Sequence, residues 1–229
     1  MTNPSEWIER GLTLEPFGDR AWLARFPTDA CAAAWAEAVR NRSWPGVVEV
    51  VAVYRSVAIF VDPSVIDPGH LELLLRCVPT AETSQRVGQR FRVPVLYDGE
   101  DLEAISKWIG LPMEEIIANH TAVEYSVRAI GFLPGFPYLG ELSEPLIGLP
   151  RRATPRTQVP AGAVAIAGQQ SCIYPEASPG GWHLIGRTPL IIADLSCAFF
   201  PIETGDRVQF DPINHRQYQQ LWGCRLGEF

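Results

Sequence analysis

The segments GFLPGFPYLG at residues 131–140 and VPAGAVAIAGQQSCIYP at residues 159–175 alternate short apolar runs with glycine and proline. Apolar runs separated by turn residues at short, even intervals are typical of a β-barrel or a closed sandwich. The same pattern extends over most of the second half of the chain. We therefore expect strands at residues 123–132, 163–167, 171–174, 182–186, 189–195 and 207–211.

The first part of the chain has a different pattern, in which strand-like and helix-like segments alternate. Thr28 precedes an alanine-rich segment with apolar residues at helical spacing, so we expect it to cap a helix over about residues 29–41. Asp67-Pro68 opens a second helix that extends to about Cys77. Strands are predicted at residues 20–26, 47–53 and 57–61, the last two as a hairpin. The order β-α-β-β-α is that of a small sheet covered by two helices.

A polar, aperiodic segment at residues 79–90 separates these two patterns. Such segments commonly connect domains, so we predict a small α+β domain at residues 1–85 and a β-barrel domain at residues 86–229. The barrel domain is expected to begin with an edge strand at residues 91–97, because Pro94 cannot donate a ladder hydrogen bond. The helices expected next lie at residues 99–109 and 112–119.

The composition excludes several classes of protein. The chain is 47% hydrophobic and 20% charged, which is typical of a folded globular protein. Its net charge of −7 disfavours general binding to nucleic acids and to anionic membranes. Because Lys107 is the single lysine beside eighteen arginines, Schiff-base and P-loop lysine chemistry is close to excluded. Any bound anion is therefore expected to be held by arginines or by backbone N–H groups.

The cysteines and the N-terminal residues indicate a cytoplasmic protein. The five cysteines are odd in number, widely spaced and without a C-x-x-C pair, which predicts reduced thiols. The four histidines are far apart in sequence, and no metal site is expected. The first residues show no basic region before an apolar run, and the most apolar stretch, residues 190–202, is too short to cross a bilayer. We expect no membrane segment.

The candidate functional surface is the glycine- and proline-rich block at about residues 120–190, because binding residues usually lie on rigid loops of a β scaffold. His120 can act as an acid–base group with Glu124, or as a cation at the end of a helix. Three arginines can clamp a carboxylate or a phosphate, unless they form structural ion pairs with the many acids. These are Arg151, Arg152 and Arg156.

The block as a whole resembles one protein family. It is similar, over nearly seventy residues in a fixed order, to the family that contains the B subunit of prokaryotic 5-oxoprolinase, the sporulation kinase inhibitor KipI and proteins labelled allophanate hydrolase subunit 1. The sequence departs from the family pattern at Ala165, Gln169 and Cys172, where glycine, or proline at 169, is usual. The matching residues are His120, Glu124-Tyr125, Gly131-Phe132, Pro134-Gly135-Phe136, Tyr138-Leu139-Gly140, Pro150-Arg151-Arg152, Pro155-Arg156, Val159-Pro160-Ala161-Gly162, Gly168, Gln170, Tyr174-Pro175, Pro179-Gly180-Gly181-Trp182 and Leu184-Ile185-Gly186.

The resemblance implies a small α+β N-terminal domain followed by a cyclophilin-like β-barrel domain. It also implies an enzyme subunit that is inactive alone and that acts with a homologous barrel protein, the C subunit, and with a separate A subunit. The complex would open 5-oxo-L-proline to L-glutamate and would require ATP and Mg²⁺. This chain would bind neither of these two cofactors permanently. His120 and Glu124 would be the acid–base residues. The substrate would be bound by Arg151, Arg152, Arg156, Tyr174 and Gln170, the last through the lactam amide.

Two alternatives stay open at this stage. A KipI-like chain would bind a sensor histidine kinase and block phosphoryl transfer. A component of a urea or allophanate amidolyase would require a biotin carrier partner, because Lys107, between Ser106 and Trp108, does not lie in a biotin-attachment motif. Copurification with a barrel homologue or with a kinase would discriminate between the oxoprolinase reading and the first alternative.

Overall fold

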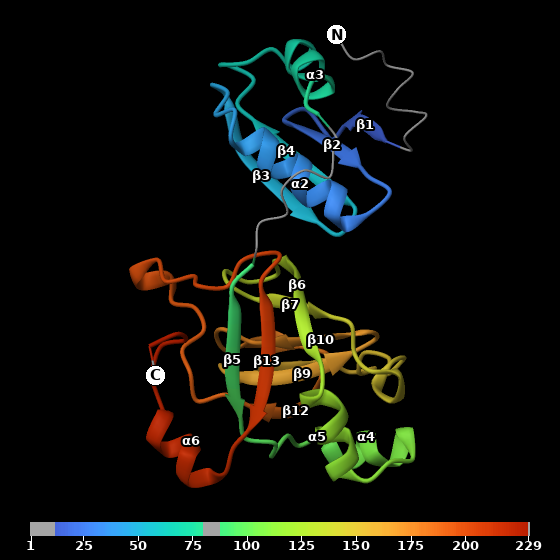
Figure 1. Cartoon of the computed structure of the whole chain (residues 1–229), viewed down its shortest axis with the longest axis vertical. Coiled ribbons are helices and arrows are strands. Elements are labelled where there is room, and N and C mark those ends of the chain that lie inside the picture. Colours follow the sequence, from blue (N-terminus) through green and yellow to red (C-terminus); the bar gives the residue numbers. More distant parts are fainter. Residues whose placement is uncertain (1–11, 80–87, 229) are drawn as a thin grey trace. The chain divides into compact units, whose positions relative to one another are not determined.

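The structure is a computed structural model that describes residues 12–79 and 88–228. The chain divides into two units, Met1–Arg86 and Val87–Phe229 (Figure 1). The boundary predicted between residues 85 and 86 lies outside the described residues. No helix in the described part of the chain has the length and apolar character needed to cross a membrane.

In its described residues, 12–79, the first unit is an antiparallel four-stranded sheet with strand order β1-β2-β4-β3, packed against two helices. The predicted hairpin is confirmed as β3 and β4. Both predicted helix caps are confirmed: Thr28 Oγ1 accepts from Cys31 N at 3.2 Å, and Asp67 Oδ1 accepts from His70 N at 2.8 Å. The elements are β1 Thr13–Pro16, β2 Ala21–Arg25, α2 Asp29–Arg40, β3 Val47–Val53, β4 Ser56–Val61 and α3 Pro68–Arg76.

The second unit is a seven-stranded sheet of order β12-β9-β10-β7-β6-β13-β5 that curls into a nearly closed barrel (Figure 1). Its two end strands meet where Leu96 and Arg187 exchange backbone hydrogen bonds of 2.9 Å. The elements are β5 Arg90–Val95, α4 Leu102–Ile109, α5 Met113–Thr121, β6 Glu124–Ile130, β7 Pro137–Gly140, η1 Glu144–Leu146, β8 Arg156–Val159, β9 Ala163–Ala167, β10 Gln170–Ile173, β11 Ser178–Gly180, β12 His183–Arg187, η2 Leu195–Cys197, β13 Arg207–Pro212 and α6 His215–Leu221.

The predicted α+β class and barrel are therefore confirmed, as is the edge position of the strand that carries Pro94. The strand predicted at residues 189–195 is wrong. Leu190 and Ile192 are buried, but the backbone of this segment bonds to the C-terminal residues instead of the sheet: Ile191 N donates to Cys224 O at 2.9 Å. Strands β1, β7, β8 and β11, of four residues or fewer, were not predicted.

Candidate functional site

The residues of β9 divide between two sides of the barrel wall. Val164 and Ile166 belong to the barrel core, whereas the three alanines of the strand face outward. Side chains alternate between the faces of a strand, so this split follows directly from the sequence AVAIA. The outward alanines, with Cys172 of β10, form a floor of small residues beneath a second hydrophobic cluster.

Four aromatic residues cover this floor, and we call them the outer aromatic cluster: Phe136, Tyr138, Tyr174 and Trp182. The Phe136 ring centre lies 5.0 Å from that of Tyr138, 5.1 Å from that of Tyr174 and 6.4 Å from that of Trp182. Tyr174 and Trp182 are buried, and Tyr138 is half-buried. The cluster thus forms a rigid, mostly apolar surface on the outside of the barrel.

Arg151 lies at the edge of this surface. Its guanidinium carbon is 5.8 Å from the centre of the Trp182 ring, and the side chain is exposed. Burial raises the pKa of the Cys172 thiol, and a hydrogen bond with the Ala165 backbone and the positive charge of Arg151 partly oppose that shift. Among the described residues, no carboxylate lies within ion-pair distance of Arg151. Its charge is therefore available to an external anion.

The other two predicted arginines are already paired. Arg152 Nη1 lies 2.7 Å and Arg156 Nη2 lies 2.8 Å from the same oxygen, Asp101 Oδ1. Arg156 Nε also lies 2.7 Å from Glu100 Oε1. For Arg152 and Arg156 the ion-pair alternative is thus what the structure shows.

Asp101 is the residue that sequence reasoning missed. Its side chain is almost completely buried just before α4, and it makes no helix-capping hydrogen bond because it faces the arginines. Burial alone would raise the pKa of its carboxyl. The hydrogen bonds from Arg156 and from the Leu184 backbone, with the charges of both arginines, outweigh this effect and hold the pKa below its usual value. No local pattern around Asp101 signals partners more than fifty residues away.

The predicted acid–base pair of His120 and Glu124 is not formed. His120 has no exposed surface, and its ring nitrogens lie 2.7 Å from the Tyr97 hydroxyl and 2.9 Å from Ser171 Oγ. Glu124 is exposed and pairs with Arg90 at 3.2 Å. Burial lowers the pKa of His120 to about 3, so the ring is neutral and the alternative of a cationic helix-end histidine is also wrong.

The remaining predicted residues differ in their access to solvent. Gln170 is half-buried and lies on the outward face of β10, two residues before Cys172. Tyr174 is buried, and its hydroxyl lies so close to Gly180 that a side-chain carbon at residue 180 would fall 2.3 Å from it. Lys107 pairs with Glu103 at 2.6 Å on the exposed side of α4, as its surface position predicts. Of the predicted binding residues, Arg151 and Gln170 thus have the access that a ligand needs.

The family of this chain is decided by its similarity to known proteins. The model of the family described as carboxyltransferase domain, subdomain C and D, matches residues 12–197. The chain belongs to this family. It is 34% identical over 233 residues to the 5-oxoprolinase B subunit of Bacillus subtilis, covering 90% of this chain and 94% of that protein. It is 41% identical over 180 residues to the 5-oxoprolinase B subunit of Haemophilus influenzae, covering 77% of this chain and 84% of that protein.

Solved structures agree with this membership. The crystal structure of TTHA0988 superposes with a TM-score of 0.75 at 36% identity; the match covers 85% of this chain but only 40% of that chain. The urea amidolyase of K. lactis shares the fold with a TM-score of 0.70 at 20% identity, covering 94% of this chain and 16% of that chain. Segments similar to this chain thus also occur within longer chains.

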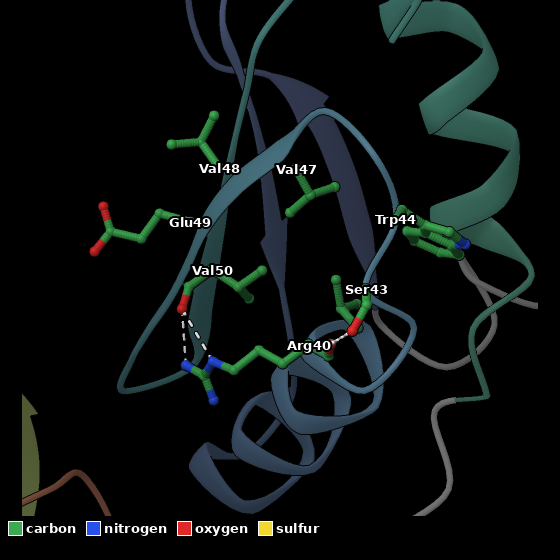
Figure 2. A pocket seen from close by; sticks show the side chains of 8 residues that line it. Arg40, Ser43, Trp44, Val47, Val48, Glu49 and Val50 are labelled. Carbon is green, nitrogen blue, oxygen red and sulfur yellow. Dashed lines mark hydrogen bonds between the residues drawn. The ribbon is translucent and has the colours of Figure 1, made fainter. Parts of the chain in front are cut away.

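A hollow of about 460 Å³ lies in the first unit (Figure 2), whereas the outer aromatic cluster belongs to the second. Arg40 donates from Nε and Nη2 to the Val50 carbonyl there, at 3.3 and 2.8 Å. Its lining is mostly apolar and its cation is already bonded, so we place the candidate site at the barrel. The hollow is lined by Val39, Arg40, Ser43, Trp44, Val47, Val48, Glu49 and Val50.

Residues 12–79 and 88–228 contain no group of three or more His, Cys, Asp or Glu side chains placed to hold a metal ion. Their five cysteines are free thiols.

Proposed function

We propose that this chain is the B subunit of an ATP-dependent 5-oxoprolinase, acting with the A subunit and with the homologous barrel protein, the C subunit. The observation that carries this proposal is the 34% identity to a 5-oxoprolinase B subunit over nearly the full length of both chains. The outward face with Arg151 and Gln170 supports it, because 5-oxo-L-proline offers a carboxylate to the first and a lactam amide to the second.

The proposed reaction requires activation of a resonance-stabilised amide. Transfer of the γ-phosphoryl group of ATP to the lactam oxygen makes carbon 5 electrophilic and releases ADP. Water then adds at carbon 5, and the bond from carbon 5 to the ring nitrogen breaks, which leaves the open-chain acyl phosphate. A second water hydrolyses this acyl phosphate and releases phosphate and L-glutamate. Such chemistry depends on positioning and on charge stabilisation, with Mg²⁺ neutralising the phosphates. This chain is proposed to contribute substrate positioning.

The test is ATP-dependent release of glutamate from 5-oxo-L-proline, with Mg²⁺ and the cognate A and C subunits. We expect glutamate in the complete mixture and none when this chain is omitted or when it is assayed alone. A verified, folded complex of all three proteins without turnover would refute the proposal.

The alternatives have less support. The urea amidolyase of K. lactis shares the fold at 20% identity, and a fold alone does not carry an activity. Binding to a sensor histidine kinase stays a prediction. Pull-down with a histidine kinase in place of the A and C subunits tests it directly.

A further inference from the structure

Arg151 lies in a segment that is held from both sides. The Pro150 carbonyl accepts a 2.8 Å hydrogen bond from His183 Nε2, and the Arg152 N–H donates to the Gly181 carbonyl at 2.8 Å. Between these bonds, the Arg151 guanidinium lies over the Trp182 ring. Three consecutive residues, 150–152, are thus fixed on three others, 181–183. The backbone of Arg151 is set before any ligand arrives, which reduces the entropy lost on binding.

Asp101 ties these two segments together. Its Oδ1 accepts from Arg152 Nη1 at 2.7 Å, next to Arg151, and its Oδ2 accepts from the Leu184 N–H at 2.7 Å, next to His183. The same Oδ1 accepts from Arg156 Nη2 at 2.8 Å. A buried carboxylate with these three donors is strongly constrained. Asp101 therefore fixes the distance between the segment that carries Arg151 and the segment that carries Trp182.

We propose that Arg151 binds the carboxylate of a small organic acid on this face, and that Asp101 is the residue that positions it. Arg152 and Arg156 are neutralised by Asp101 and Glu100, so Arg151 is the member of the trio whose fork faces solvent without an acid partner in the described chain. Asp101 is buried and does not reach the anion. The inference rests on the proposed function only for the choice of acid, 5-oxo-L-proline.

The test measures binding to the isolated full-length chain by calorimetry. The probes are 5-oxo-L-proline and 2-pyrrolidinone, which has the same lactam ring without the carboxylate. We expect saturable binding of 5-oxo-L-proline and much weaker binding of 2-pyrrolidinone. Arg151→Gln should weaken binding of 5-oxo-L-proline about tenfold or more, because a charged bidentate contact is lost, and should leave binding of 2-pyrrolidinone unchanged.

Asp101→Asn should weaken binding of 5-oxo-L-proline about three- to tenfold, again without an effect on 2-pyrrolidinone. In the Arg151→Gln background, Asp101→Asn should have no further effect on 5-oxo-L-proline, because the two residues act on the same contact. A general loss of structure would weaken both probes and would add to Arg151→Gln. Arg216→Gln, on the exposed helix α6, is the matched control and should bind as the wild type does.

If Asp101→Asn does not fold, Arg152→Gln replaces it, since it removes the one Asp101 contact next to Arg151. Binding equal to that of the wild type in Arg151→Gln, or in a folded Asp101→Asn or Arg152→Gln variant, overturns the corresponding part of the proposal. The proposal is also overturned if the wild-type chain binds no 5-oxo-L-proline at concentrations of tens of millimolar. These outcomes are separate from the turnover assay, which needs all three proteins of the complex and tests the proposed function.

Discussion

At the scale of single residues, His120 is enclosed by aromatic rings inside the barrel. Its ring centre lies 4.6 Å from that of Phe210, 5.3 Å from that of Tyr125 and 5.8 Å from that of Tyr97. Ser171 Oγ donates to the Ala165 carbonyl at 3.3 Å, so His120 Nε2 is the donor toward Ser171, and the Tyr97 hydroxyl donates to Nδ1. In this network one ring nitrogen donates and the other accepts, as in a neutral imidazole. The neutral form agrees with burial, which lowers the pKa of His120 to about 3.

The neutral state of His120 predicts a loss of stability in acid. The pKa is lowered from 6.5 when unfolded to about 3 when folded, so between these values the unfolded chain binds a proton that the folded chain does not. The contribution of His120 to stability is complete above about pH 6.5 and decreases by at most about 1.4 kcal/mol per pH unit below it. The measurement is the free energy of unfolding in urea from pH 7.5 to 4.5.

His120→Gln removes this titration, so its free energy of unfolding should fall less steeply with decreasing pH than that of the wild type, although the variant is less stable at pH 7.5. His70→Gln is the control, because it removes an exposed histidine at the start of α3. Parallel curves for the wild type and His120→Gln would show that folding does not lower the pKa of His120.

The residue scale also shows where sequence reasoning ends. Arg151, Arg152 and Arg156 are equivalent as a sequence pattern, and each was an anion-binding candidate. Their roles separate only through Asp101, which precedes Arg152 by 51 residues and Arg156 by 55. Such a long-range pairing has no local signal. The block that carries the candidate site could be chosen from the sequence, whereas which of its arginines form ion pairs could not.

At the scale of elements, prediction succeeded where local chemistry decides the structure. Capping by Thr28 and Asp67 set the start of two helices, and the β-branched run of β3 and β4 set a hairpin. It failed for residues 189–195, which are as apolar as a strand but pair with the C-terminal segment. The apolar composition of a segment predicts that it is buried, but the backbone groups with which it pairs depend on the rest of the fold.

The edge strand β3 is an element whose exposed side needs protection. It is a β-branched run, VVEVVAV, at the end of its sheet, and such edges can pair with other chains. Arg40 occupies the outward carbonyl of Val50, as Figure 2 shows. We expect Arg40→Ala to increase self-association, because it frees this carbonyl and removes a charge from the edge. Size-exclusion chromatography with light scattering, at several concentrations, measures the change.

Arg42→Ala is the control for this prediction. Arg42 is exposed like Arg40, but it donates to the Ala38 carbonyl of the helix and contacts no atom of β3 by a hydrogen bond. It removes the same charge without uncovering the strand, so it should associate no more than the wild type. If both variants associate more than the wild type and to the same extent, the effect is due to net charge. If neither variant associates more than the wild type, Arg40 does not protect this edge.

At the scale of the whole molecule, the charge distribution limits what this chain can bind alone. The net charge is −7, and the single lysine, Lys107, is paired with Glu103. Arg152 and Arg156 are neutralised by Asp101 and Glu100, so the outer aromatic cluster has Arg151 as its available cation in the described chain. One arginine suits one carboxylate. The triphosphate of ATP requires several cationic groups or backbone N–H donors beyond it.

We therefore expect the isolated chain to bind no ATP–Mg²⁺ over the concentration range in which the assembled complex does, because the missing positive charge must come from a partner protein. Equilibrium dialysis with labelled ATP, on this chain alone and on the complete complex, measures this directly. Dialysis of the isolated chain is repeated with 5-oxo-L-proline present. This control detects a nucleotide site that forms only after the acid has bound to Arg151. Saturable ATP binding by the isolated chain, with or without 5-oxo-L-proline, would place the phosphate site on this chain and would show that no partner protein has to supply the positive charge.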